Sequence, residues 1–447
     1  VNVGTYPGHK VRIYTDKGII YGAVANSREI SRNKELEASG LRIDIGATDR
    51  TEALKHVQLG DTVTFDTDVR ELLNDRITGR ALDDRVGAYI VMEAIAEAKK
   101  RGACVVHMKT QKGLGYLPSE CEPSKYHGIG AFDIESGEAH KKTSTTFSSV
   151  AGETLTRLAR EDGKICAITA AMADGTGLTP FADEFPSRFY DVGIAEEHAV
   201  TFAGGLAKNG MKPILALYST FAQRSFDQAL HDISLQKLPL TLLLDRCGVV
   251  EGDGYTHQGV FDYQLFSCVP NAKIYSPETY EELKNTISKS VSDGCLSVVR
   301  YPKGAQATYE PAREMIYDGD HMLYYSSGIE AARRVIVTYG RMTEVANEAL
   351  KDLPSDTGIV KLVKIFPLDR DYLVGILSGK ELVYVLEEIY KDGCVGEKIA
   401  SCLAGTQARV KIKAIDTFVP CGTLSELYEH LSLTPRDVVN EIISEKM

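Results

Sequence analysis

Several common features are missing from this sequence, and each absence narrows the class of protein. The formal charge of −11 excludes a general nucleic-acid binder, which needs a basic excess to neutralise phosphates. No run of about eighteen apolar residues occurs, so a membrane span is not expected. The first residues, Val1–Pro7, lack the basic and apolar regions of a signal peptide.

Cysteines at metal-binding spacing are also missing. The nine cysteines are scattered and none forms a C-x-x-C pair, so no zinc site is expected. An odd, unpatterned set in a long chain is typical of reduced thiols. We therefore expect a cytoplasmic protein and no metal site built from this chain's own residues.

The first hundred residues are β-rich. Composition is ordinary for a soluble globular protein, with 43% hydrophobic and 25% charged residues among 447, and leaves room for about two to four domains. Short runs bounded by Gly, Asp and Asn predict strands, and helical spacing of apolar residues predicts one helix. The strands are expected at His9–Thr15, Ile19–Ala25, Leu41–Ile45 and Asp61–Phe65, and the helix at Asp84–Lys100.

From Thr146 onward, strands and helices alternate regularly. The predicted strands are Ile165–Thr169, Tyr190–Val192, Pro213–Leu217, Pro239–Leu244, Leu296–Arg300, Arg334–Thr338, Gly358–Lys364, Leu382–Leu386 and Val410–Ile415. The predicted helices are Ala195–Asn209, Phe221–Gln236, Glu278–Val291, Thr343–Leu353, Tyr372–Ser378, Val395–Leu403 and Leu424–Leu431. This repetition predicts an α/β fold class: two doubly wound domains, each with a largely parallel sheet covered on both faces.

The predicted domain limits follow from these changes of pattern. Residues 1–103 form the β-rich region, and residues 104–145 a strand (Cys104–Thr110) followed by a polar connector. Residues 146–312 and 313–447 are the two α/β domains, with the boundary inside Ala305–Tyr325.

Polar residues suited to chemistry gather between Phe189 and Asp262. Glu196 opens a helix directly after a predicted strand, at the sheet edge where α/β proteins bind ligands. Alone, such a glutamate is more often a first-turn residue stabilised by the helix dipole. Phe221 opens the next predicted helix, and alone it is equally well a core residue.

An arginine set at the ends of neighbouring strands predicts an anion site. Arginine presents a planar fork suited to phosphate, and tyrosine adds a neutral donor. A lone arginine there is usually a surface ion-pair partner, so the argument depends on the group. Its members are Tyr218, Arg224, Arg246 and Arg300.

The loop Glu251–Gly259 contains Asp253 and His257. Imidazole titrates near neutrality, which suits His257 to proton transfer, with a structural histidine as the alternative. Gly252-Asp253-Gly254 resembles half of a magnesium-diphosphate motif, but no asparagine follows it at a fitting distance.

Together these motifs resemble the 1-deoxy-D-xylulose-5-phosphate synthase family of thiamine-diphosphate enzymes. The matching motifs are Ile194-Ala-Glu-Glu-His-Ala-Val200, Tyr218-Ser-Thr-Phe-Ala-Gln-Arg224, Asp253-Gly-Tyr-Thr-His-Gln-Gly259 and Val299-Arg-Tyr-Pro-Lys-Gly304. The resemblance covers roughly residues 105–447 and implies a transketolase-type pyrimidine-binding domain followed by a C-terminal domain.

The resemblance also implies a reaction, a cofactor and residue roles. Pyruvate and glyceraldehyde 3-phosphate would give 1-deoxy-D-xylulose 5-phosphate and CO₂, a step toward isoprenoids and thiamine, in a homodimer. Glu196 would hydrogen-bond the aminopyrimidine of thiamine diphosphate and favour the tautomer that deprotonates the thiazolium carbon. Phe221 would pack on that ring, and His257 would assist proton transfers. The residues implied in substrate binding are Tyr218, Arg224, Arg246, Asp253 and Arg300.

Only the tail of the diphosphate-binding domain is recognisable upstream. Lys109–Tyr116 and Ser124–Asp133 match that tail, and the resemblance implies that Tyr116 and His127 approach the cofactor. The Mg²⁺ ligands are expected in the part of the domain that is missing. The chain is therefore expected to be inactive alone, or to be completed by a separate chain as in split thiamine enzymes.

The N-terminal residues resemble a different family, the co-catalytic metallo-aminopeptidases of the tetrahedral-particle type. The matching stretches are Ile43–Ala47, Gly60–Asp66 and Gly79–Gly87, where Asp83 would match the metal-bridging carboxylate. A two-metal site needs several further ligands, and their motifs are absent. We therefore expect Asp83 and Asp84 to be solvated or capping residues, and a metallopeptidase fragment is the less favoured function. The abrupt change near Ala103 indicates a fusion, a rearrangement or an assembly artefact.

Overall fold

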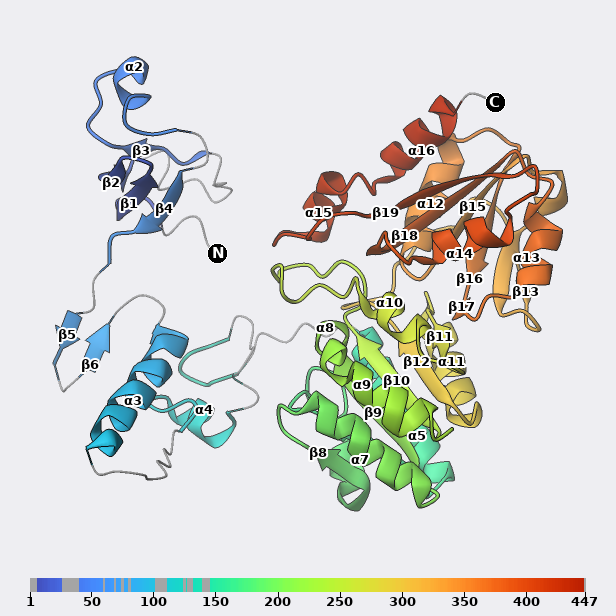
Figure 1. Cartoon of the computed structure of the whole chain (residues 1–447), viewed down its shortest axis with the longest axis horizontal. Helices are drawn as coiled ribbons and strands as arrows, with labels where there is room; N and C mark the ends of the chain where they lie inside the picture. The colour runs from blue at the N-terminus through green and yellow to red at the C-terminus, as the bar shows by residue number, and fades with distance from the viewer. Residues whose placement is uncertain are drawn as a thin grey trace. The chain divides into compact units, whose positions relative to one another are not determined.

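The computed structural model describes most of the chain, in two compact units, Val1–Thr110 and Gln111–Met447 (Figure 1). The described residues are 6–25, 40–58, 61–67, 70–73, 76–78, 82–100, 111–123, 126, 132–138 and 145–445. No helix in these ranges has the length and apolar content needed to cross a membrane.

The first unit contains a small antiparallel sheet in the order β3-β2-β1-β4. Val11 and Ile13 are buried on alternate positions of β1, so one face of the sheet is covered. The sheet's elements are β1 (Lys10–Thr15), β2 (Gly18–Val24), β3 (Ile43–Asp44) and β4 (Thr62–Phe65). The unit also holds α2 (Arg50–Ala53), the hairpin β5 (Arg70–Leu72) and β6 (Arg76–Thr78), and α3 (Leu82–Lys99). The predicted strands and helix of this region are confirmed within a few residues.

A seven-stranded sheet forms the first domain of the second unit, in the order β17-β11-β12-β10-β9-β7-β8. Every residue of β10 (Leu240–Asp245) is buried, because helices cover both faces. One face packs on α5 (Phe147–Glu161) and α11 (Tyr280–Ser292), and the other on α7 (Glu196–Lys208) and the turns that follow β9. The remaining strands are β7 (Ile165–Thr169), β8 (Phe189–Asp191), β9 (Lys212–Tyr218), β11 (Lys273–Tyr275) and β12 (Leu296–Arg300); α6 (Thr179–Glu184) and α10 (Asp262–Ser267) are short helices.

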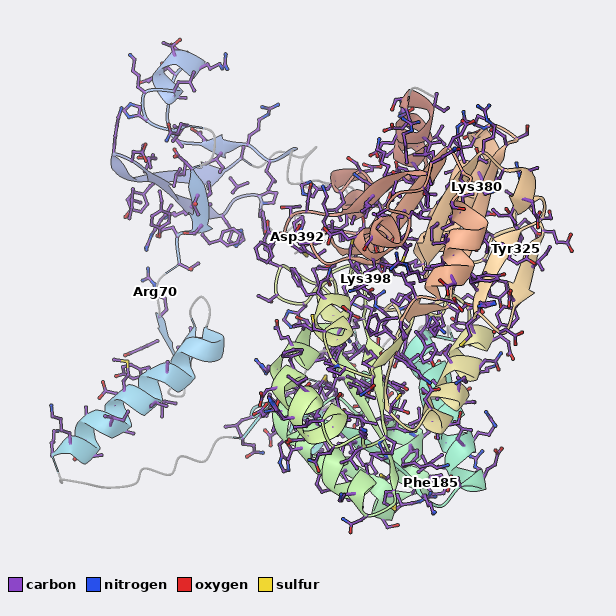
Figure 2. The ribbon with its side chains drawn as sticks, turned by 45° about the vertical axis from the view of Figure 1, so that its right-hand side comes forward. Arg70, Phe185, Tyr325, Lys380, Asp392 and Lys398 are labelled. Carbon is purple, nitrogen blue, oxygen red and sulfur yellow. The ribbon has the colours of Figure 1, made fainter. Side chains whose placement is uncertain are left out.

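A six-stranded sheet forms the second domain, in the order β13-β14-β16-β15-β18-β19. Its strands are β13 (Met315–Asp318), β14 (Leu323–Ser326), β15 (Arg334–Tyr339), β16 (Thr357–Leu362), β18 (Leu382–Tyr390) and β19 (Arg409–Ile415). One face packs on α12 (Met342–Asp352), α15 (Leu424–His430) and α16 (Pro435–Ser444), and the other on α13 (Arg370–Leu377) and α14 (Val395–Cys402). Side chains from both domains fill the interior between them (Figure 2).

The α/β fold class is confirmed, while two local predictions, one helix and one strand, are wrong. The helix predicted at Phe221–Gln236 is broken into α8 (Ser219–Ala222), a 3₁₀ turn, α9 (Phe226–Gln228) and a π-helical turn at Ala229–Ser234. Within the predicted boundary segment Ala305–Tyr325, β13 and most of β14 pair into the second sheet, and the limit at 312/313 stays a prediction. The strand predicted at Gly358–Lys364 is divided, and its end begins β17 (Lys364–Phe366), which pairs antiparallel with β11 of the first sheet. The strand predicted at Cys104–Thr110 lies outside the described residues.

Candidate active site

The predicted site residues lie at one edge of the first sheet. Glu196 follows β8, Tyr218 ends β9, and Arg246 follows β10. These strands are parallel, with Tyr218 in register with Asp245, so their carboxyl ends meet at the same edge. That edge is where sheets of this class bind ligands.

Glu196 is a buried carboxylate at the first turn of α7. It is 2% exposed, and its Oε2 lies 3.3 Å from Nη1 of Arg224. Arg224 is half-exposed, and its guanidinium carbon lies 5.8 Å from the ring centroid of Phe221. The ion pair and the positive end of the helix dipole offset part of the cost of burying this carboxylate.

Phe221 connects the glutamate to the tyrosine and the histidine of the predicted site. Its ring stacks with that of Tyr218 at a centroid distance of 5.8 Å and meets the edge of the His257 ring at 5.5 Å. The hydroxyl of Thr256 lies 2.8 Å from Nδ1 of His257. This contact fixes the orientation of the imidazole beside the aromatic surface.

Two cations and a tyrosine surround Asp253. Arg246 donates from Nη2 to the Tyr218 hydroxyl at 2.8 Å, and its Nη1 lies 3.5 Å from Oδ2 of Asp253. Lys303 Nζ lies 3.5 Å from the same carboxylate oxygen and donates to the Glu251 carbonyl at 3.1 Å. The backbone of Arg246 has φ +60°, a conformation that a non-glycine residue rarely adopts outside constrained sites. The group carries donors and positive charge suited to a phosphate.

Asp245 lies beneath this group and is completely buried. The Ser148 hydroxyl donates to its Oδ2 at 2.6 Å. Burial raises the pKa of the Asp245 carboxyl to about 6, against smaller opposing effects of the Ser148 hydrogen bond, the nearby cations and the backbone amide of Arg246. Burial likewise raises the pKa of the Tyr218 hydroxyl, which keeps it a donor at neutral pH.

Arg300 does not join the anion group in this structure. It is 3% exposed, and its guanidinium forms two hydrogen bonds to Asp262, at 2.8 and 3.2 Å. The thiol of Cys247 also donates to Asp262, at 3.2 Å, and burial raises the pKa of this thiol. Of the predicted anion set, the structure brings together Tyr218 and Arg246, while Arg224 and Arg300 pair with carboxylates.

The loop that carries Asp253 and His257 is closed by its own hydrogen bonds. Gly248 and Gly259 exchange backbone hydrogen bonds of 2.7 and 3.0 Å across its neck. The buried Gln258 side chain accepts from the Val250 amide at 2.7 Å. These contacts join the two ends of the loop and anchor its interior.

The upstream residues predicted to approach the cofactor are placed only in part. Tyr116 precedes α4 (Leu117–Cys121), packs against Tyr126 and Phe132, and donates to the Ile134 carbonyl at 3.0 Å. His127 and the side chains of Asp83 and Asp84 lie outside the described residues. In the described part of the chain, no group of three His, Cys, Asp or Glu side chains is arranged to hold a metal ion.

Three residues of the site were missed from the sequence: Lys303, Asp245 and Ser148. Lys303 lies inside the motif Val299–Gly304 that carries part of the resemblance, so a signal was available for it. In the sequence, Asp245 is recognisable only as the last residue of a strand, next to Arg246. Ser148 lies far from both of them in the chain. Only the fold shows that they meet.

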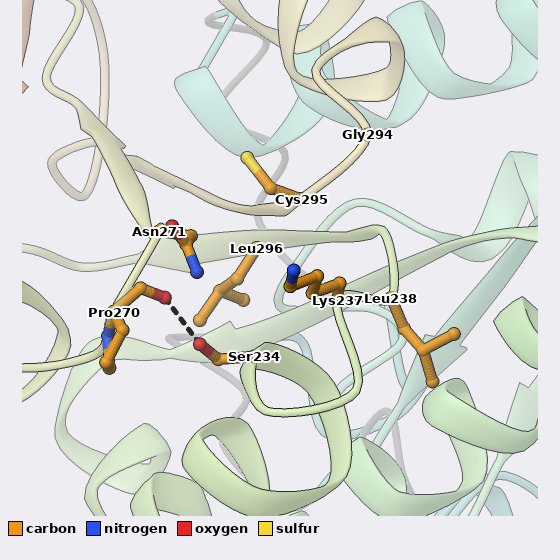
Figure 3. A pocket seen from close by; sticks show the side chains of 8 residues that line it. All are labelled: Ser234, Lys237, Leu238, Pro270, Asn271, Gly294, Cys295 and Leu296. Atoms are coloured by element: carbon orange, nitrogen blue, oxygen red, sulfur yellow. Dashed lines mark hydrogen bonds between the residues drawn. The ribbon is translucent and has the colours of Figure 1, made fainter.

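A cavity lies at the other end of the strands of this sheet, away from the predicted site (Figure 3). It measures about 280 Å³ and lies at the amino ends of β10, β11 and β12. Its lining residues are Ser234, Lys237, Leu238, Pro270, Asn271, Gly294, Cys295 and Leu296. None of them belongs to the cluster described above, so we do not connect this cavity with the chemistry.

Family models match three stretches of the chain. Residues 143–307 match the pyrimidine binding domain of transketolase, and residues 330–438 match the transketolase C-terminal domain. Residues 1–125 match the M42 glutamyl aminopeptidases, so this similarity runs past the limit predicted at residue 103. Both predicted resemblances are confirmed.

Curated relatives have the same similarity. A 1-deoxy-D-xylulose-5-phosphate synthase of Natranaerobius thermophilus is 38% identical over 371 residues, which cover 79% of this chain and 57% of the relative. Another synthase of this name, from Clostridium acetobutylicum, is 38% identical over 362 residues, with 79% and 58% covered. The chain thus spans a little over half the length of the curated relatives it matches.

Solved structures show the same fold. A chain titled "Split gene transketolase, inactive beta4 tetramer" matches with a TM-score of 0.58 and 24% identity, over 67% of this chain and 98% of that one. A transketolase from Campylobacter jejuni matches with a TM-score of 0.58 and 17% identity, over 73% and 50%. The chain therefore joins an N-terminal stretch similar to M42 glutamyl aminopeptidases to transketolase-type pyrimidine-binding and C-terminal domains homologous to those of 1-deoxy-D-xylulose-5-phosphate synthases.

Proposed function

We propose that the second unit is the pyrimidine-recognising half of a thiamine-diphosphate-dependent transferase. The reaction is that of the synthase relatives: pyruvate and glyceraldehyde 3-phosphate give 1-deoxy-D-xylulose 5-phosphate and CO₂. One observation carries the proposal. Glu196 is a carboxylate 2% exposed at the start of α7, linked through Arg224 to the ring of Phe221.

The residues present fit the aminopyrimidine end of the cofactor. Glu196 would accept a hydrogen bond from a ring nitrogen, and Phe221 offers an aromatic face for stacking. Bound thiamine diphosphate supplies the nucleophilic carbon for addition to a 2-oxo acid. We assign the diphosphate and its Mg²⁺ to a domain other than the two described here.

The cations on the neighbouring strand ends are suited to the phosphate of the second substrate. Arg246 and Lys303 supply charge, and Tyr218 supplies a neutral donor. Asp253 lies between both cations and orients them. His257, held by Thr256, would transfer a proton at the aldehyde oxygen as the new carbon–carbon bond forms. Roles for Arg224 and Arg300 in binding substrate stay predictions.

We further infer that activity requires a diphosphate-binding domain in addition to these two domains, and that a separate chain can supply it. The chain covers 57% of the first relative, and a split-gene transketolase chain described as an inactive tetramer matches over 98% of its length. The match of residues 1–125 to M42 aminopeptidases supports a second candidate, a metallopeptidase fragment. A homodimer remains the expected assembly, which sedimentation would check.

The test combines the chain with a diphosphate-binding domain cut from a synthase relative. Deoxyxylulose phosphate should form only when both proteins, thiamine diphosphate and Mg²⁺ are present. Glu196→Gln should lower this rate at least ~10²-fold, the range for losing a group that controls proton transfer, without changing the thermal midpoint. Glu197→Gln, a change to the exposed neighbour, is the matched control and should keep the rate.

Three outcomes would revise the proposal. Absence of product from the combined proteins would contradict it. Product formation by the chain alone, or its binding of thiamine diphosphate with micromolar affinity in calorimetry, would show that no second chain is needed. Zinc- or cobalt-dependent peptide cleavage would favour the metallopeptidase candidate.

A further inference from the structure

Asp245 is a buried acid with an unexplained free oxygen. It is 1% exposed, and Ser148 satisfies Oδ2. Its Oδ1 is buried and has no hydrogen-bond partner of good geometry among the residues that the structure describes, although the backbone amide of Arg246 is near enough to lower the pKa of the carboxyl slightly. Buried polar atoms are nearly always partnered, so an orphaned carboxylate oxygen beside a proposed anion site requires a reason.

The charged and titratable groups around Asp245 are already engaged with one another. The guanidinium of Arg246 contacts Tyr218 and Asp253, and the ammonium of Lys303 contacts Asp253 and a backbone carbonyl. No ion pair with Asp245 is formed in the described ranges. The other groups that face it are Ser148 from α5, Tyr218 from the end of β9 and Tyr301 after β12, whose buried hydroxyl also lacks a partner there.

The charges of the four ionisable side chains at this site sum to zero only when no charged ligand is bound. Arg246 and Lys303 contribute two positive charges, and Asp245 and Asp253 contribute two negative ones. A doubly charged anion bound by the two cations would leave an excess of negative charge next to a carboxylate that is out of contact with water. A like charge and burial both favour the neutral form of a carboxylic acid. Asp245 is the more buried of the two acids, since Asp253 is 23% exposed.

We propose that Asp245 takes up one proton from solvent when a dianion, such as a phosphate ester, binds at Arg246 and Lys303. The proton leaves a buffer acid in solution and forms an O–H bond on the carboxyl group, and no bond within the protein or the anion is broken. The protonated carboxyl group can then donate a hydrogen bond, so the oxygen that lacks a partner would have a function beside the bound anion. This inference rests on the anion site of the proposed function and adds a proton-linked selection of dianions to it.

Burial already raises the pKa of Asp245 to about 6 in the free protein. The acid is therefore mostly ionised at pH 7 before binding, and a modest further rise caused by the anion is enough to protonate it. Between roughly pH 6 and pH 8 the uptake should approach one proton, and below pH 5 it should disappear because the acid is already neutral.

Sulfate is a suitable probe, because it stays doubly charged over this range and any proton taken up must go to the protein. The full-length chain is titrated with sulfate by calorimetry at pH 7 in two buffers of different ionisation enthalpy, and the difference in heat counts the protons. We expect an uptake close to one, and a sulfate affinity that falls up to tenfold per pH unit above pH 7.

Variants identify the group that takes up the proton. Asp245→Asn mimics the neutral acid and should bind sulfate with no proton uptake and no pH dependence. His257→Gln is the control for the imidazole of the site, and it should keep the uptake if Asp245 is the group that takes up the proton. Arg246→Ala should lose sulfate binding, which confirms where the probe sits.

The outcomes separate this inference from the proposed function. Sulfate binding with unchanged proton uptake in Asp245→Asn, or with no uptake in the unaltered chain, would overturn the inference and leave the anion site intact. Loss of uptake in His257→Gln would assign the proton to the histidine instead. Failure of the unaltered chain to bind sulfate at tens of millimolar would contradict the anion site itself, and with it both proposals.

Discussion

Arg341 donates from Nη2 to Oε2 of Glu388 at 2.7 Å, and this pair holds the start of the loop that carries Asp253 and His257. The same Nη2 donates to the Val249 carbonyl at 2.7 Å, and Glu388 accepts from the Val249 amide at 3.2 Å. Arg341 and Glu388 both belong to the C-terminal domain. That domain therefore fixes a loop of the candidate active site in the neighbouring domain.

Glu388→Ala should destabilise the protein and free the loop. The change leaves the buried Arg341 without its carboxylate, which typically costs about 3–5 kcal/mol of unfolding free energy. Urea denaturation should show the loss, and the Val249 amide should exchange faster with deuterium. The control is Glu348→Ala, which removes an exposed ion pair with Lys351 and should cost less than about 1 kcal/mol. Equal losses of unfolding free energy in the two variants would show that Glu388 does not hold the loop in place.

Alanine should be tolerated at Gly252 much better than at Gly248. Both glycines have positive φ, +75° and +78°, so an alanine costs about 1–2 kcal/mol of backbone strain at either position. At Gly248 a Cβ would also lie 2.4 Å from Cδ of Glu388, whereas at Gly252 no described atom lies within 4 Å. We expect Gly248→Ala to lose about 1–3 kcal/mol more, measured by urea denaturation. Combining it with Glu388→Ala should recover part of that excess; if it recovers none, the contact is not the cause.

The buried ion pair of Arg300 and Asp262 should contribute far more to the unfolding free energy than an exposed pair of similar geometry. Asp262→Ala leaves a buried guanidinium unpaired and should cost about 3–5 kcal/mol. Arg160 forms the matching two-point contact with Glu184, at 2.7 and 2.6 Å, on the surface. Glu184→Ala should therefore change the unfolding free energy by less than about 1 kcal/mol. Similar thermal midpoints for the two variants would show that burial does not set the strength of these pairs.

Asp245 should make the protein less stable as pH rises from 4 to 6. Its folded pKa, about 6, lies above its ordinary value of 3.8, so the folded state holds the proton more tightly. The stabilisation is complete below pH 4 and is lost as pH rises through 6. A shift of about two units corresponds to roughly 3 kcal/mol. The difference in unfolding free energy between the unaltered chain and Asp245→Asn, measured by urea denaturation, should change by this amount across the window, and a constant difference would refute it.

Much of the second unit could be predicted because its signals are local. Apolar runs such as Ile165–Thr169 and Leu296–Arg300 are found as strands with the predicted bounds, since strands covered on both faces need nothing but apolar residues. Glu196 could be placed at a sheet edge for a similar reason. A strand followed at once by a helix fixes where the first helical residue lies.

The rest depends on contacts between residues distant in sequence. Nothing near Arg300 indicates that Asp262 will occupy its fork, and nothing near Asp245 indicates that Ser148 will cover it. The helix predicted at Phe221–Gln236 has suitable residues throughout, yet it is interrupted by 3₁₀ and π turns as it packs between α7 and the sheet. Local helix propensity predicts the backbone conformation poorly where tertiary packing determines it.

The strand β17 has a practical consequence for dissecting this protein. It follows β16 of the C-terminal domain, yet Phe366 pairs with Ile274 at the outer edge of the neighbouring sheet, and Lys398, labelled in Figure 2, lies 5.6 Å from the ring of Phe366. A shortened protein ending near residue 312 would expose the bare edge of β11. Unprotected edges recruit other chains, so this fragment should aggregate when expressed, whereas one that continues through the final helix should not aggregate. The smallest piece worth producing is thus the pair of domains, not either one by itself.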